Sequence, residues 1–242
     1  EYELNKNKKG VVAVIPRRDL ELEALVEVLE KKRFITCHSY VQSEINSAMK
    51  VAEEMGYTVN TFTHILEGYK VADKMKAHGV VGASTFSDWW AYKFEVYYST
   101  AYNATILTRN GVVTSINSDS GELIRHLFHE AAKTQRYGDL SDEEALALIT
   151  INPARQLGID SKVGSIETGK DADLAIFSGH PLSIYAIPQV TIVDGIVRFD
   201  KAHDPADMRL YIDPEESTPT YYGQEDVEGC MRDTEFMFSH RH

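Results

Sequence analysis

Three polar side chains that commonly bind metals each follow a short apolar stretch. His38 ends the segment Phe-Ile-Thr-Cys-His, His64 ends Val-Asn-Thr-Phe-Thr-His, and Asp119 ends a longer run that begins at Gly111. Two imidazoles and a carboxylate suit a divalent ion that activates water. We therefore expect part of a hydrolytic metal site at these three residues.

The spacing of these residues indicates a repeated strand–helix unit. The intervals are 26 residues, from 38 to 64, and 55 residues, from 64 to 119. A (β/α)8 barrel takes roughly 250 residues for eight units, or roughly 31 for each unit. The two intervals are therefore close to one unit and two units. Because such barrels hold their chemistry at the carboxyl ends of the strands, the three side chains should meet there.

The order of the expected elements predicts an α/β fold with parallel strands and helical crossovers. Strands should end near residues 38, 64, 84 and 119, and residues 11–15 are compatible with one more short strand. Apolar periodicity and capping residues predict helices over 19–32, 42–55, 67–78, 121–136 and 141–157. Residues 1–158 thus hold about four βα units and a terminal helix, too few to close an eight-stranded barrel.

After residue 158 the apolar period changes from helical to alternating. Short strands are expected at 163–166, 172–177, 190–193 and 196–199, with Asp194-Gly195 as a hairpin turn. We expect residues 159–201 to form part of a small β-sandwich domain. Residues 202–242 are polar, contain three prolines and should form an extended tail.

Composition excludes several kinds of partner. The net charge is −12 and no basic cluster stands out, so neither nucleic acid nor an anionic membrane surface is expected to bind. No apolar run approaches the ~18 residues of a membrane span. The first residue is Glu1 rather than an initiator Met, so we expect a fragment of a longer protein. Its compartment, cytoplasmic or periplasmic or secreted, is left open.

Several motifs resemble the amidohydrolase superfamily of metal-dependent hydrolases, in its imidazolonepropionase-like branch. They are Asn-Pro-Ala-Arg-Gln-Leu-Gly at 152–158, Gly-Ser-Ile-Glu-Thr-Gly-Lys-Asp-Ala-Asp-Leu at 164–174, Thr-His-Ile-Leu-Glu-Gly-Tyr-Lys at 63–70 and Asn-Ser-Asp-Ser at 117–120. The resemblance covers nearly all of residues 17–200. It implies the C-terminal half of a TIM-type barrel, followed by strands of a β-sandwich.

The resemblance also implies roles for the three residues. His38 and His64 match metal ligands after strands five and six, and Asp119 matches the aspartate after strand eight. The metal would be zinc, or else Fe, Mn or Ni. Asp119 would act as general base and pass the proton to the leaving nitrogen, while His64 or His38 would polarise the substrate carbonyl.

Two elements of the family pattern are not identified in residues 1–242. They are a His-x-His pair on the first strand and the bridging lysine or glutamate that the fourth strand often carries. We therefore expect a partner that supplies the N-terminal half of the barrel, either as a segment removed from this sequence or as a separate chain.

Glu67, Tyr69 and Lys70 follow His64 at the expected mouth of the barrel. Glu67 either orients a ligand imidazole or is an acid in the first turn of a helix, where the helix dipole favours it. Tyr69 and Lys70 either contact substrate or belong to a solvated helix face.

Both tryptophans of the chain, Trp89 and Trp90, lie in the aromatic segment 85–95, together with Lys93. A long aromatic loop on the catalytic face is typical of a lid or a substrate wall. The alternatives are packing against the missing half of the barrel and an oligomer contact, which would make the protein a homo-oligomer.

The sequence thus predicts metal-dependent hydrolysis of a C–N bond in a small molecule or short peptide, at an amide, cyclic amide or related group. One alternative is a deaminase of the same architecture. The other is a non-catalytic barrel half that acts as a structural partner.

Overall fold

The structure, a computed structural model, describes residues 2–15, 17–89 and 93–203. Its helices are α1 (Tyr2–Asn5), α2 (Leu20–Leu29), α3 (Gln42–Met55), α4 (Ala72–His78), α5 (Asn103–Arg109), α6 (Leu127–Gly138), α7 (Asp142–Ala147) and α8 (Ile151–Leu157), with the 3-10 helices η1 (Gly68–Lys70), η2 (Phe94–Val96) and η3 (Leu123–His126). Its strands are β1 (Thr36–His38), β2 (Thr61–Thr63), β3 (Gly82–Thr85), β4 (Thr114–Ile116), β5 (Leu174–Phe177), β6 (Pro188–Val193) and β7 (Ile196–Asp200). Trp90 and the predicted tail beyond residue 203 lie outside the described residues.

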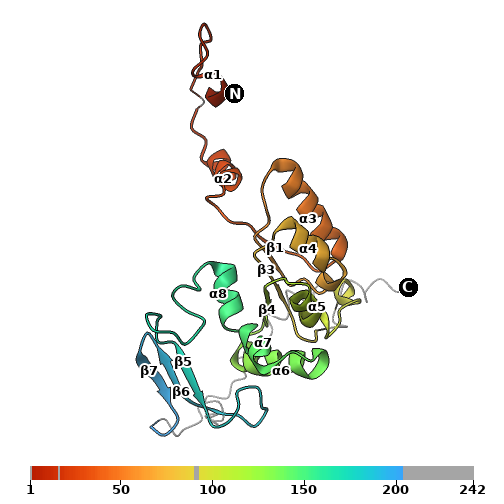
Figure 1. Cartoon of the computed structure of the whole chain (residues 1–242), viewed down its shortest axis with the longest axis vertical. Helices are drawn as coiled ribbons and strands as arrows, with labels where there is room; N and C mark the ends of the chain where they lie inside the picture. The colour runs from red at the N-terminus through yellow and green to blue at the C-terminus, as the bar shows by residue number, and fades with distance from the viewer. Residues whose placement is uncertain (1, 16, 90–92, 204–242) are drawn as a thin grey trace, which may run out of the picture.

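The first four strands form one parallel sheet in the order β1-β2-β3-β4 (Figure 1). The chain passes through α3, α4 and α5 between successive strands, as parallel pairing requires. Residues 85–110, for which no helix was predicted, therefore contain a crossover helix, α5. The α/β prediction is confirmed, and all four carboxyl ends lie at the same edge of the sheet.

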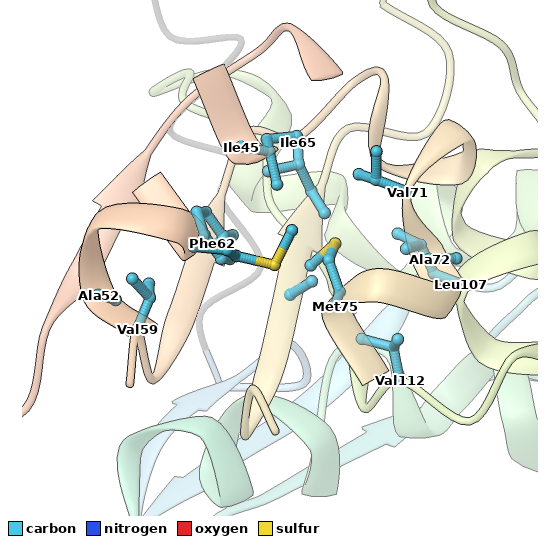
Figure 2. Packing of buried hydrophobic residues seen from close by; sticks show 12 residues of the cluster. Ile45, Ala52, Val59, Phe62, Ile65, Val71, Ala72, Met75, Leu107 and Val112 are labelled. Atoms are coloured by element: carbon cyan, nitrogen blue, oxygen red, sulfur yellow. The ribbon is translucent and has the colours of Figure 1, made fainter. Parts of the chain in front are cut away.

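The strand register shows what each face of this sheet packs against. Phe62 pairs with Cys37 on one side and with Ala83 on the other. Phe62 and Ala83 belong to the hydrophobic cluster beneath the helices, in which Figure 2 labels Phe62, and Cys37 packs against this cluster. Because side chains alternate along a strand, His38 and its partner Thr63 point from the opposite face. The imidazole of His38 is thus kept out of the hydrophobic core.

Helix α3 has the predicted bounds because its signals are local. Ile45, Met49 and Ala52 recur at helical spacing and are buried, and Gly56 ends the helix in the left-handed conformation with φ 81°. Burial of a side chain such as Ile45 contributes about 1.5–3 kcal/mol. This buried face packs α3, which connects β1 to β2 in the chain, against the sheet.

The N-terminal segment differs from the prediction. Asp19 caps α2 as expected, since its carboxylate accepts hydrogen bonds from two backbone N–H groups of the first turn. The apolar face of the helix is exposed, however, by 46–61% at Leu22, Leu25, Val26 and Leu29. Residues 11–15 form no strand. Figure 1 shows this part of the chain extending away from the parallel sheet, so it finds no surface there to pack against.

The helix predicted over 141–157 is two helices, α7 and α8. Ser141 and Glu144 form the predicted capping box at the start of α7. Pro153 has no backbone N–H, and its ring would clash with the carbonyl four residues earlier in a continuous helix. A new helix therefore begins at Ile151, with Pro153 in its first turn.

The last three strands form an antiparallel sheet in the order β5-β6-β7. Asp194 and Gly195 both have positive φ, 52° and 74°, as the predicted two-residue hairpin requires. Residues 163–166, predicted as a strand, form none. Within the described ranges, no helix is both long and apolar enough to cross a membrane.

Candidate active site

The structure brings His38, His64 and Asp119 together at the carboxyl edge of the parallel sheet. His38 is the last residue of β1, His64 directly follows β2, and Asp119 lies three residues after β4. The ring centroids of His38 and His64 are 4.4 Å apart, with the rings tilted by 47°. Nδ1 of His64 lies 3.9 Å from Oδ2 of Asp119. His64 is therefore the middle member of the cluster.

His64 and Asp119 share an uncommon backbone conformation. Their φ angles are 64° and 46°, in the left-handed region that few residues other than glycine adopt. Strained backbone of this kind concentrates at functional sites, because the surrounding structure must hold it in place.

The environment of His64 favours the neutral imidazole. Its side chain is 14% exposed, and Nδ1 is buried without a hydrogen-bond partner. Burial lowers the pKa of His64 below its ordinary value of 6.5, and His38 and Lys93 lower it further while Asp119 opposes them. A neutral imidazole offers the lone pair that a metal ion or a substrate proton needs.

Aromatic rings surround His64 on its other sides. Tyr40 and Phe86 meet it edge to face, with centroids 5.8 and 4.8 Å away. Trp89 stacks on Phe86 with centroids 4.4 Å apart and planes tilted by 7°. Such a shell limits water access to the imidazole. The aromatic loop after β3 thus contributes one wall of the site.

The donor atoms fit a divalent ion in part. Two atoms that bind one zinc ion at about 2.0–2.2 Å lie at most about 4.4 Å apart. The 3.9 Å between His64 Nδ1 and Asp119 Oδ2 is within this limit, and the buried Nδ1 has a lone pair available. Across residues 2–15, 17–89 and 93–203, however, no three His, Cys, Asp or Glu side chains are arranged to hold a metal ion. The assignment of His38, His64 and Asp119 as ligands stays a prediction.

Glu67 holds two loops together. Its carboxylate accepts a hydrogen bond from the backbone N–H of Gln42 at 2.9 Å and pairs with Lys70 at 2.9 Å, while its side chain is 4% exposed. Gln42 is the first residue of α3, so Glu67 stabilises the N-terminus of that helix from the loop after β2. The negative charge of Glu67 therefore favours the N-terminus of α3. The sequence did not indicate that Glu67 and α3 would be in contact.

Tyr69 and Lys70 lie in the 3-10 helix η1, where Lys70 is exposed, and both contact Tyr98 in the segment after η2. The Tyr69 hydroxyl donates to the carbonyl oxygen of Tyr98 at 2.9 Å. The Lys70 ammonium lies 4.2 Å from the centroid of the Tyr98 ring. These two contacts fasten the segment after η2 to the loop after β2. Substrate contact by Tyr69 and Lys70 remains a prediction.

A buried polar network anchors the start of the aromatic loop. The Ser87 hydroxyl donates to the carboxylate of Glu130 on α6, whose side chain is 4% exposed. The Lys133 ammonium lies 2.9 Å from both Glu130 Oε1 and Asp88 Oδ1. These bonds hold the two residues that precede Trp89, and with them the stacked wall of the site.

Asn103 is a positioning residue that the sequence did not reveal. It is fully buried at the start of α5, and its amide nitrogen donates to the Ile65 carbonyl at 2.7 Å and to the Thr85 hydroxyl at 2.8 Å. Its oxygen accepts from the Tyr69 N–H at 2.8 Å. One side chain thus joins the residue after His64 to the end of β3. Asparagine at a helix start is typical of a cap, so the pattern gave no signal for this role.

Asn103→Ala should destabilise the protein strongly. The Tyr69 N–H would lose its acceptor, and an unsatisfied group of this kind costs about 1–3 kcal/mol when buried. The Ile65 carbonyl would lose one of its two donors and keep the Gly68 N–H. The free energy of unfolding, measured with urea, should fall accordingly. Asn110→Ala is the matched control, because Asn110 is exposed and bonds only one turn back, to Ile106. An equal loss in the two variants would contradict the role of Asn103.

Comparison with known proteins agrees with this arrangement. The family model of the amidohydrolase family matches residues 12–199. Amidohydrolase tasK of Hapsidospora irregularis is 29% identical over 211 residues, which cover 83% of this chain and 21% of that protein. Imidazolonepropionase of Thermoplasma volcanium is 30% identical over 139 residues, which cover 55% of this chain and 33% of the relative.

Solved structures show the same relationship. The crystal structure of an amidohydrolase from Thermotoga maritima superposes with a TM-score of 0.70 at 29% identity, covering 82% of this chain and 51% of that one. The chain therefore spans between about a fifth and about half of the length of these relatives. With a family model matched over most of its length and a parallel sheet whose carboxyl edge gathers His38, His64 and Asp119, the chain belongs to the amidohydrolase family.

Proposed function

We propose that this chain is the C-terminal half of a (β/α)8 barrel in a metal-dependent hydrolase. Its reaction is the cleavage of a C–N bond, in an amide, cyclic amide or related group of a small molecule or short peptide. The observation that carries the proposal is the buried Nδ1 of His64, unpaired and 3.9 Å from a carboxylate oxygen of Asp119. A hydrolase of this kind needs a neutral imidazole and a carboxylate side by side.

Each residue has a distinct task in this reaction. His38, His64 and Asp119 would hold the divalent ion, which typically accompanies this family and is zinc or else Fe, Mn or Ni. When bound, the ion would supply a water whose pKa is lowered toward about 7. Asp119, whose side chain is 55% exposed, would act as the general base that accepts a proton from water. The same carboxyl would then give the proton to the leaving nitrogen.

The remaining metal ligands would come from outside residues 1–242, on the half of the barrel whose strands pair with β1 and β4. The exposed apolar face of α2 supports this proposal, because helices of a barrel bury that face against strands. The four parallel strands are half the number that the barrel needs. The active unit is then the full-length protein, or this chain together with a chain that supplies the other half.

The test uses the full-length protein, with and without added zinc, on a panel of amides, cyclic amides, dipeptides and amidines. Metal-dependent formation of a new carboxylate is expected from one of the first three classes. Release of ammonia from an amidine without a new carboxylate would show a deaminase instead. Metal content at a small fraction of one ion per chain, without turnover, would favour a non-catalytic barrel half.

A further inference from the structure

The loop between β5 and β6, residues 178–187, packs a leucine against two helices of the barrel portion. Leu182 is 8% exposed and belongs to one cluster with Ala131 of α6 and Ala145 of α7, both of which are fully buried. Ile184, two residues further along the same loop, is 73% exposed. Figure 1 shows both helices next to the antiparallel sheet to which the loop belongs. The loop therefore contacts α6 and α7 through a defined side chain.

Hydrogen bonds within the loop give it a fixed shape. The Ser183 N–H donates to the His180 carbonyl oxygen at 2.9 Å, and the Ala186 N–H donates to the Ser183 carbonyl oxygen at 2.9 Å. The His180 imidazole also reaches α7, where its Nε2 lies 3.1 Å from Oδ2 of Asp142. A loop that is ordered by its own bonds loses little entropy when it packs against the helices.

The two ends of α6 are held by different parts of the protein. At its last residue, a Cβ on Gly138 would overlap with the side chain of Thr105, so this end lies directly against α5. In the first turn, the ring of Phe128 meets that of Phe177 in β5 at 5.1 Å between centroids. Ala131, in the next turn, packs against the 178–187 loop. The position of the first half of α6 therefore depends on the antiparallel sheet and its loop.

This same half of α6 holds the start of the aromatic loop. Glu130 is adjacent to Ala131, is 3% exposed and accepts a hydrogen bond from the Ser87 hydroxyl. A buried carboxylate is costly unless it is hydrogen-bonded, so Ser87 is held where Glu130 lies. Trp89, two residues after Ser87, stacks on Phe86 as the wall beside the candidate cluster.

We propose that Leu182 and Glu130 are positioning residues of the candidate active site. The 178–187 loop holds the first half of α6 in place, and α6 in turn holds the stacked wall beside His64. This inference rests on the proposed function, because it gives the small antiparallel sheet a role in shaping the site of that reaction.

Hydrogen-bond geometry explains why the link transmits small displacements. A bond between two oxygens is formed over a range of only about 0.5 Å, from about 2.5 to 3.0 Å. If α6 moves by more than this, Ser87 either follows Glu130 or loses the bond. The neighbouring pair of Lys133 with Asp88, at 2.9 Å, joins the same two elements but is partly exposed and contributes less.

The test observes Trp89 directly and does not require turnover. The full-length protein is labelled with 5-fluorotryptophan, and the Trp89 resonance is assigned by its absence in Trp89→Phe. Its chemical shift reports the stacking on Phe86, through the ring current of that phenyl group. Leu182→Ala and Ser87→Ala should each move this resonance toward its position in the unfolded protein. Ile184→Ala is the matched control in the same loop and should leave the resonance unchanged.

Two further comparisons separate a positioning role from a general loss of packing. Leu182→Ala should cause little additional shift in a protein that already carries Ser87→Ala, because the link is then broken. Glu130→Gln keeps an oxygen that can accept the Ser87 hydroxyl and should leave the resonance near its native position, whereas Glu130→Leu should displace it. Leu182→Val removes less volume and should shift the resonance in the same direction, so the test does not depend on the folding of Leu182→Ala.

The proposal is overturned if the Trp89 resonance stays at its native position in the Leu182 variants, or if the shifts of Leu182→Ala and Ser87→Ala add in full. Coupled shifts in a protein without metal-dependent hydrolysis would refute the proposed function alone. Metal-dependent hydrolysis together with an unmoved resonance would refute the positioning roles alone.

Discussion

His64→Ala should abolish most of the metal binding of the full-length protein. His64 is the central member of the cluster, and its buried Nδ1 has no other partner. Loss of a residue that only supports a ligand costs about 10–100-fold in metal affinity, so loss of a ligand should cost more. Zinc at about 100 times the native dissociation constant should stabilise the native protein by about 2.7 kcal/mol, and most of this gain should disappear in the variant.

The measurement is zinc content after dialysis, together with the rise in Tm on adding zinc. His203→Ala is the control, because this imidazole is 84% exposed and contacts Asp200, far along the chain from His64. Unchanged zinc content in His64→Ala would remove His64 from the ligand set. If the only effect of His64→Ala were a lower Tm of the metal-free protein, His64 would have a packing role among the rings of Tyr40 and Phe86.

Asp119→Asn should reduce turnover far more than it reduces metal content. The amide keeps the shape of the side chain and an oxygen that can bind a cation, but it cannot accept the proton of the attacking water. General acid–base catalysis contributes about 10²–10⁴-fold, so kcat should fall by about this factor. Asparagine also tolerates the positive φ of this position, so the backbone should not change.

Asp194→Asn is the matched control for this substitution. Asp194 also has a positive φ, 52°, but lies in the β6–β7 hairpin, where Asn-Gly is a favoured turn. Both variants should bind zinc to at least half of the native content. Native activity in Asp119→Asn would exclude this carboxylate as the base.

The assignments that agree with the structure depend on residues close together in the chain. Helix α3 is defined by Ile45, Met49, Ala52 and the glycine that follows it, all within four turns. The capping box at Ser141 and the turn at Asp194 need even fewer residues. Local signals of this kind hold in any tertiary context that leaves the segment in place, which is why the sequence alone predicted them.

The candidate site was accessible to sequence reasoning for a topological reason. Parallel strands place their carboxyl ends at one edge, so His38, His64 and Asp119 could be expected there from strand order and spacing. The contacts that hold the site could not be expected. The pairing of Glu67 with the N-terminus of α3 and the three bonds of Asn103 join residues 18 to 38 positions apart.

The sequence by itself determined where most helices and strands of the parallel sheet occur, their α/β order and which polar residues follow the strands. These depend on periodicity and caps, which act over a few residues. Only the tertiary structure decided that residues 11–15 form no strand, that the apolar face of α2 stays exposed, and that Lys93 lies over Tyr40. Burial and long-range contacts depend on which surfaces meet after folding, and the same apolar pattern is compatible with a buried or an exposed face.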